Sequence, residues 1–133
     1  MFFISSEPIK SDVLSSSIQD ENAGALVVFE GRVRKKNQGR EVQRLEYEAY
    51  ETLCHVEFQK IMDEAIRNFS VLEMSCVHRV GILEVGELAV WLGVLAVHRK
   101  EAFLACEYGI QELKKRLPIW KKEFYTEGAH DFL

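Results

Sequence analysis

This 133-residue chain lacks the sequence signatures of several common site chemistries. It has only three cysteines, Cys54, Cys76 and Cys106, with no CxxC pair and no histidine at ligand spacing. Each lies in an apolar stretch, so we expect buried, reduced thiols rather than disulfides or a metal site. No Gly-x-Gly-x-x-Gly, P-loop, HExxH or EF-hand motif occurs, and no Ser-His-Asp or Cys-His arrangement is readable. The sequence therefore predicts no bound metal or cofactor.

Long apolar runs are absent as well. No window approaches the ~20 apolar residues that a membrane-spanning helix needs. The first residues, MFFISSEPIKSD, have no positive region and too short an apolar run for a secretory signal. The composition, 47% hydrophobic and 29% charged, is typical of a soluble globular protein. We therefore expect one domain over residues 1–133, located in the cytoplasm and without membrane contact.

Positive charge is scarce outside two segments. The formal net charge of −4 argues against a general nucleic-acid binder. Residues 32–44 contain six Lys and Arg and residues 98–122 contain seven, out of 17 in the chain. An acidic protein that gathers its positive charge in two places is expected to bind an anion there.

The hydrophobic patterns predict an α+β domain with a largely antiparallel sheet. Strands are expected at 2–4, 24–33, 42–50, 71–79 and 87–97, and helices at 52–69 and 98–117. A weaker helix is expected to start at Ser11, as a candidate N-cap, and to end near Gln19. Residues 24–33 are apolar throughout, which would suit a strand buried on both faces. With residues 42–50 they are expected to form a hairpin with a basic tip, RKKNQGR.

Residues 98–117 have an apolar stripe that is expected to face the core. Its members recur at three- and four-residue spacing: Phe103, Cys106, Ile110, Leu113 and Leu117. Within residues 42–50, Val42 and Arg44 are expected to share the solvent-facing side and Leu45 and Tyr47 the covered side.

Two lysine clusters flank Pro118. Proline cannot continue a helix, so the chain is expected to turn and to bring Lys121 and Lys122 back on a separate segment. Lys114 and Lys121 could then approach each other, and neighbouring ammonium groups lower each other's pKa, which a nucleophile or proton carrier requires. The alternative is that both are solvated lysines at a helix end.

His98 and Arg99 lie where an apolar strand meets the expected helix N-terminus. Free backbone N–H groups favour anions there, and Arg99 can add a bidentate contact to phosphate or carboxylate. His98 could transfer a proton or bind the anion, or it could be a structural histidine. His55 and His78 have weaker claims. The residues alone indicate a basic pocket for a small phosphorylated or carboxylated ligand.

The chain resembles the large, catalytic subunits of molybdopterin synthase, the MoaE family. The resemblance rests on GALVVFEGRVRKKNQG from Gly24, HRVG from His78, LAVHRKEAF from Leu95 and LKKRLPIWKKE from Leu113, in the family's order. It implies an α/β hammerhead-like domain with an additional, largely antiparallel β subdomain. It also implies a sulfurtransferase that converts cyclic pyranopterin monophosphate into molybdopterin, and no cofactor.

The resemblance further implies a partner and a set of site residues. Two sulfurs would come from the C-terminal Gly-Gly thiocarboxylate of a small ubiquitin-like subunit, with one such subunit at each end of a central homodimer, giving a heterotetramer. Lys114 and Lys121 would be catalytic, and the arginines and His98 could come from opposite protomers. The substrate-binding positions would be Arg32, Val33, Arg34, His98, Arg99, Lys114, Lys121, Lys122 and Glu123.

Two other functions are compatible with the sequence. A non-catalytic module could use the same basic pocket to bind the tail of a ubiquitin-like protein, and lysine substitutions would then weaken partner binding in step with activity. A nucleic-acid binder that uses the basic hairpin is disfavoured by the overall acidity and the lack of an aromatic platform.

Overall fold

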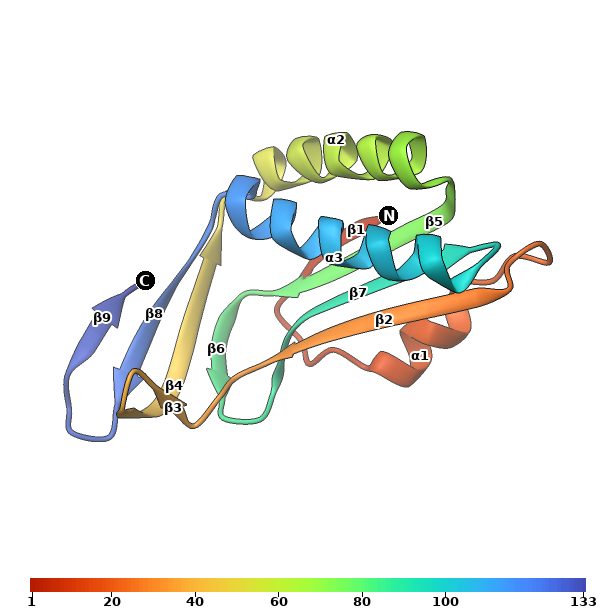
Figure 1. The fold of residues 1–133 in the computed structure, drawn as a ribbon. Helices are drawn as coiled ribbons and strands as arrows, with labels where there is room; N and C mark the ends of the chain where they lie inside the picture. Colours follow the sequence, from red (N-terminus) through yellow and green to blue (C-terminus); the bar gives the residue numbers. More distant parts are fainter.

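The computed structural model describes residues 1–133 as two sheets and three helices (Figure 1). Only β1 and β5 pair in parallel, so the expected α+β class and the largely antiparallel pairing are confirmed. The elements in chain order are β1 (Phe2–Ser5), α1 (Ser11–Ser17), β2 (Ala25–Arg32), β3 (Lys36–Asn37), β4 (Arg40–Ala49), α2 (Glu51–Phe69), β5 (Val71–Arg79), β6 (Gly81–Glu84), β7 (Leu88–Ala96), α3 (Arg99–Arg116), β8 (Ile119–Tyr125) and β9 (His130–Phe132).

The first sheet has the strand order β1-β5-β7-β2. Helices α2 and α3 cover one of its faces and the short α1 lies on the other (Figure 1). The apolar stripe of α2 is buried at Phe58, Ile61 and Ala65, as its spacing predicts. The same core contains all three cysteines, which are free and buried, as expected.

The second sheet has the order β3-β4-β8-β9, with β6 paired to β4. A smaller core lies against it, formed by Val33, Val42, Leu45, Leu83, Ala89 and Tyr125. A register shift between Val42 and Arg44 places Val42 in this core, so its expected position on the solvent-facing side is wrong. Strand β6 has no counterpart among the predicted strands, because its four residues are too few to show an alternating pattern.

Strand β2 is at the edge of the first sheet, and the prediction that it is buried on both faces is wrong. It pairs only with β7, and none of its residues is fully buried. Ala25 and Phe29 pack on the main core, whereas Val28 packs on a small cluster beside α1. The apolar run therefore reflects partial contact on both faces.

The expected hairpin between β2 and β4 is also wrong, because these strands lie in different sheets. The hairpin is formed by β3 instead, where Lys36 pairs with Glu41 and Asn37 with Arg40. Gly39, at the turn, has a φ of 79°, a left-handed conformation that favours glycine.

Two helix predictions need correction. Phe103 is 60% exposed, whereas Cys106, Leu113 and Leu117 of the same stripe are buried as predicted. The small residues Ala102, Ala105 and Gly109 are buried with them. Ser11 does not cap α1, because its Oγ accepts a hydrogen bond from Trp91 Nε1 at 3.0 Å and Lys10 occupies the N-cap position. None of the three helices combines the length and the apolar character that a membrane-spanning helix requires.

Candidate functional site

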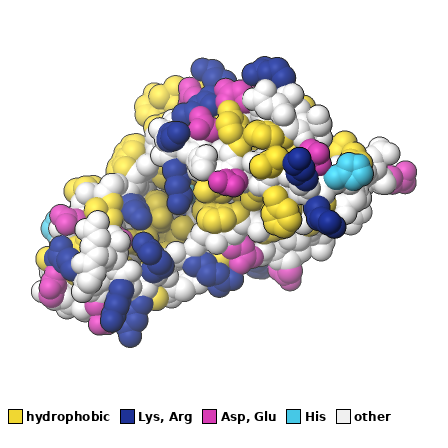
Figure 2. Space-filling model, viewed as in Figure 1, with side chains coloured by type: hydrophobic (Ala, Val, Ile, Leu, Met, Phe, Trp, Pro, Cys, Tyr) yellow, Lys and Arg dark blue, Asp and Glu magenta, His cyan; other side chains and the backbone are white.

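A pocket of ≈ 700 Å³, here named the basic pocket, lies where the two sheets and the last turns of α3 meet. Figure 2 shows Lys and Arg side chains gathered around apolar ones on this face. The walls are apolar, from Phe29, Val90, Ile110, Leu113, Leu117 and Ile119. The polar side chains are mainly cations and two uncharged rings: Arg32, Arg34, Lys114, Lys121, Tyr47 and His78. The two basic segments of the sequence thus contribute to one pocket.

Pro118 explains how both lysines reach the basic pocket. Leu117 has extended backbone angles, φ −76° and ψ 132°, as the residue before a proline prefers, and α3 ends there. The chain continues as β8, antiparallel to β4, with Lys121 directly opposite Tyr47. Lys114 therefore enters from the helix and Lys121 from the strand.

Most of the positive charge in the basic pocket is not neutralised by the protein. Neither Lys114 nor Lys121 forms a salt bridge, whereas Lys115 and Arg116 beside them are paired with carboxylates. Arg34 is unpaired too, and only Arg32 has a partner, with its Nη2 2.6 Å from Glu30 Oε1. A hydrogen bond from Ser11 and the Arg32 guanidinium lower the pKa of Glu30, so that it stays ionised.

Five of the predicted substrate-binding residues lie outside the basic pocket: Val33, His98, Arg99, Lys122 and Glu123. Val33 is buried in the smaller core. Lys122 is on the opposite side of β8 from Lys121, and its Nζ lies 5.1 Å from the ring centroids of Phe124 and of Phe132.

Glu123 is also placed elsewhere, with only 4% of its surface exposed. Its Oε1 accepts hydrogen bonds from Asn37 Nδ2 at 2.9 Å and from the Tyr125 hydroxyl at 3.0 Å. The carboxylate thus joins the β3–β4 hairpin to β8.

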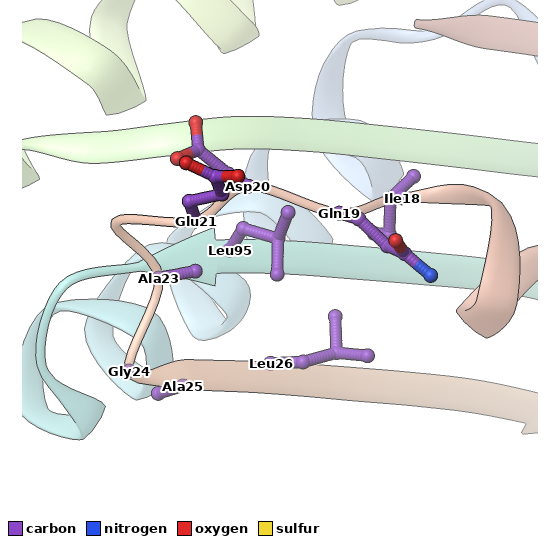
Figure 3. Close-up of a pocket in the computed structure, with 9 residues that line it drawn as sticks. All are labelled: Ile18, Gln19, Asp20, Glu21, Ala23, Gly24, Ala25, Leu26 and Leu95. Carbon is purple, nitrogen blue, oxygen red and sulfur yellow. The ribbon is translucent and has the colours of Figure 1, made fainter.

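His98 and Arg99 are far from the basic pocket of their own protomer. They line a separate hollow with Gly24, Val97 and Lys100, at the start of α3. Arg99 and Lys114 lie at opposite ends of the helix, about 22 Å apart along its axis. A neighbouring hollow, below the turn before β2, carries Asp20 and Glu21 above Leu26 and Leu95 (Figure 3).

Sequence reasoning missed Tyr47 and gave little weight to His78. His78 is 6% exposed, and its ring meets the Tyr47 ring edge-on, with centroids 5.1 Å apart. Burial lowers the pKa of His78, so the ring is neutral at neutral pH. Burial and the Glu123 charge raise the pKa of Tyr47, so its hydroxyl keeps its proton. Two features of the sequence could have pointed to these residues: the alternation of residues 42–50 for Tyr47, and the HRVG motif for His78.

Lys114, Lys121 and Arg34, which have no protein partner, stand above apolar walls, so this α+β domain has a pocket suited to a small anion. Residues 4–116 match the family model described as MoaE protein. The chain is 42% identical over 111 residues to the molybdopterin synthase catalytic subunit of Pyrococcus abyssi. The matched stretch covers 84% of this chain and 75% of that protein. This chain belongs to the MoaE family of molybdopterin synthase catalytic subunits, enzymes of molybdenum cofactor biosynthesis.

Solved structures show the same fold. Molybdopterin synthase from Staphylococcus aureus superposes with a TM-score of 0.92 at 36% identity, covering 98% of this chain and 94% of that one. A chain from the complex of subunits 1 and 2 of molybdopterin-converting factor from Helicobacter pylori superposes with a TM-score of 0.81 at 26% identity, covering 98% and 88%. The expected fold, with its additional antiparallel β subdomain, is confirmed.

Proposed function

We propose that this chain converts cyclic pyranopterin monophosphate into molybdopterin, with two sulfurs supplied by the thiocarboxylated Gly-Gly tail of a small ubiquitin-like subunit. The observation that carries the proposal is the convergence of Arg32, Arg34, Lys114 and Lys121 on one pocket. The substrate phosphate and the thiocarboxylate are both anions, and cations without protein partners are available to both. The three reduced, buried thiols suit the cytoplasmic location that we also propose.

The two lysines have different surroundings, which supports different roles. Lys121 lies opposite Tyr47 on the neighbouring strand, deep between the sheets, and is assigned to proton transfer as the thiocarboxylate sulfur attacks the pterin side chain. Lys114 is in the last turn of α3 and is assigned to orienting the carboxylate of the tail. Arg34 is free to bind the phosphate, together with His98 and Arg99.

His98 and Arg99 can reach this site only from another protomer, so the proposal includes a two-fold homodimer. Strand β2 offers an open edge for it, flanked by the exposed apolar side chains of Leu26 and Phe103. Antiparallel pairing of two β2 strands would bring the start of one strand beside the end of the other. His98 and Arg99, which lie beside Gly24, would then approach Arg32 and Arg34 of the second protomer.

Charge complementarity supports this arrangement. Asp20 and Glu21 lie at the start of β2 (Figure 3), and Arg32, whose side chain is 61% exposed, lies at its end. Antiparallel pairing would therefore place opposite charges near each other at both ends of the seam.

Mixing two inactive variants tests the shared site. Lys121→Ala and His98→Ala are each expected to be inactive as homodimers, but a mixed dimer has one site with both residues intact. Recovery of activity on mixing, after subunit exchange, supports the shared site. If the mixture stays inactive although mass spectrometry shows mixed dimers, the two residues do not act in one site.

The catalytic roles are tested with purified protein, thiocarboxylated small subunit and cyclic pyranopterin monophosphate, by quantifying molybdopterin. Lys114→Ala and Lys121→Ala are expected to abolish product while still binding the small subunit, measured in parallel by calorimetry. Lys122→Ala is the matched control, since that side chain faces away from the basic pocket. If wild-type protein binds the small subunit and makes no product, the proposed reaction is wrong and the chain acts as a tail-binding module.

A further inference from the structure

The basic pocket contains one uncharged base among its cations. The guanidinium groups of Arg32 and Arg34 and the ammonium groups of Lys114 and Lys121 can only donate hydrogen bonds. Glu30 is already paired with Arg32, and of the uncharged polar side chains that line the pocket only the Tyr47 hydroxyl and the His78 ring can accept. A ligand that has N–H donors as well as an anionic group must therefore find its acceptor elsewhere in the pocket, because an unpaired donor in a desolvated site loses binding free energy.

The structure fixes the tautomer of His78. Nδ1 lies 2.8 Å from the Arg79 carbonyl oxygen. A carbonyl only accepts hydrogen bonds, so Nδ1 carries the proton and Nε2 of the neutral ring is an acceptor. Nε2 makes no hydrogen bond to the protein and is not fully enclosed, in a residue that lines the basic pocket.

The position of the ring is also fixed. The Tyr47 ring packs edge-on against it at an interplanar angle of 76°. Arg79, which supplies the carbonyl, is held by its own side chain, with Nη1 3.0 Å from Glu87 Oε2 and Nη2 3.4 Å from the Ile82 carbonyl. Because the ring is held by Tyr47 and by the Arg79 carbonyl, His78 Nε2 is pre-organised to accept a hydrogen bond from a ligand.

We propose that His78 Nε2 accepts a hydrogen bond from an N–H group on the ring system of the bound anion, and thereby determines specificity for ring-bearing ligands. The cations bind the anionic group, and His78 distinguishes a phosphorylated ring with donors from a bare phosphate. This inference rests on the proposed function, in which the ring is the pterin, whose N–H groups are such donors.

Two substitutions separate the acceptor from the packing. His78→Phe keeps a flat ring against Tyr47 and removes Nε2, whereas His78→Gln replaces the acceptor with an amide oxygen. Binding of cyclic pyranopterin monophosphate and of inorganic phosphate is measured by calorimetry for wild type and both variants. We expect His78→Phe to weaken pterin binding roughly tenfold and His78→Gln to remain within about threefold of wild type. Phosphate binding is expected to be unchanged in both.

Other outcomes overturn the inference. Equal losses for the two variants, or a parallel loss of phosphate binding, mean that His78 only supports the pocket wall. Unchanged pterin binding in His78→Phe means that Nε2 contacts no donor, while the proposed function survives. If wild-type protein does not bind cyclic pyranopterin monophosphate at all, the proposed function fails and this inference fails with it.

Discussion

Glu123 is a structural residue in this fold, and replacing it with alanine tests that conclusion. Its buried carboxylate accepts hydrogen bonds from Asn37 and from Tyr125, so Glu123→Ala leaves two donors without an acceptor. Hydrogen bonds to a charged group contribute about 1.5–3 kcal/mol each, and the desolvation of the carboxylate offsets part of the sum. We expect the free energy of unfolding to fall by about 3 kcal/mol, or roughly 10 °C in melting temperature.

Urea unfolding followed by tryptophan fluorescence measures this loss. Glu84→Ala is the matched control, because Glu84 is exposed and makes no side-chain hydrogen bond, and its change should be within about 0.5 kcal/mol. A double-mutant cycle with Asn37→Ala should give a coupling energy of about 1–2 kcal/mol. A Glu123→Ala protein that is as stable as wild type but binds the pterin more weakly would refute this reasoning and return Glu123 to the substrate site.

Three further predictions follow from the structure. Gly93→Ala should lower the free energy of unfolding by about 2 kcal/mol, because the added Cβ would overlap Trp91 Cη2; an unchanged urea midpoint would contradict this. The lowered pKa of His78 means that only the unfolded state gains this proton just below pH 6.5, so the contribution of His78 to stability should be flat above that pH and decline below it. This decline should weaken in His78→Gln, as urea midpoints across pH will show. Lys122→Ala should leave pterin affinity unchanged while Lys121→Ala reduces it, and equal losses in calorimetry would reject the assignment of Lys122 to the outer face.

The features that were predicted correctly depend on residues close together in the sequence. The stripe of α2 and the break at Pro118 depend on neighbouring residues alone, and both are observed. The charge of the two basic segments pointed to an anion site, and Lys114 and Lys121 do lie in one pocket.

The errors concern relations between distant segments. Whether β2 pairs with β4 or β7 depends on the whole sheet order, and its apolar run is compatible with either. The bulge at Val42 shifts that residue to the opposite face, which no alternation rule includes. Family motifs marked Lys122 and Glu123 beside Lys121, but Lys122 is the adjacent strand residue and points to the opposite face. Glu123 shares the face of Lys121, and its carboxylate is bound by Asn37 and Tyr125 instead.

The basic pocket spans two bodies that share no strand ladder. His78 and Phe29 belong to the first sheet, Tyr47 and Lys121 to the second, and neither sheet is hydrogen-bonded to the other as a continuous ladder. Any ligand that contacts residues of both sheets therefore restrains the motion of one sheet relative to the other. Ligand binding should slow amide hydrogen exchange both at the end of β5 and at the start of β8. Without ligand, the enzyme should exchange fastest where the two sheets meet at the basic pocket.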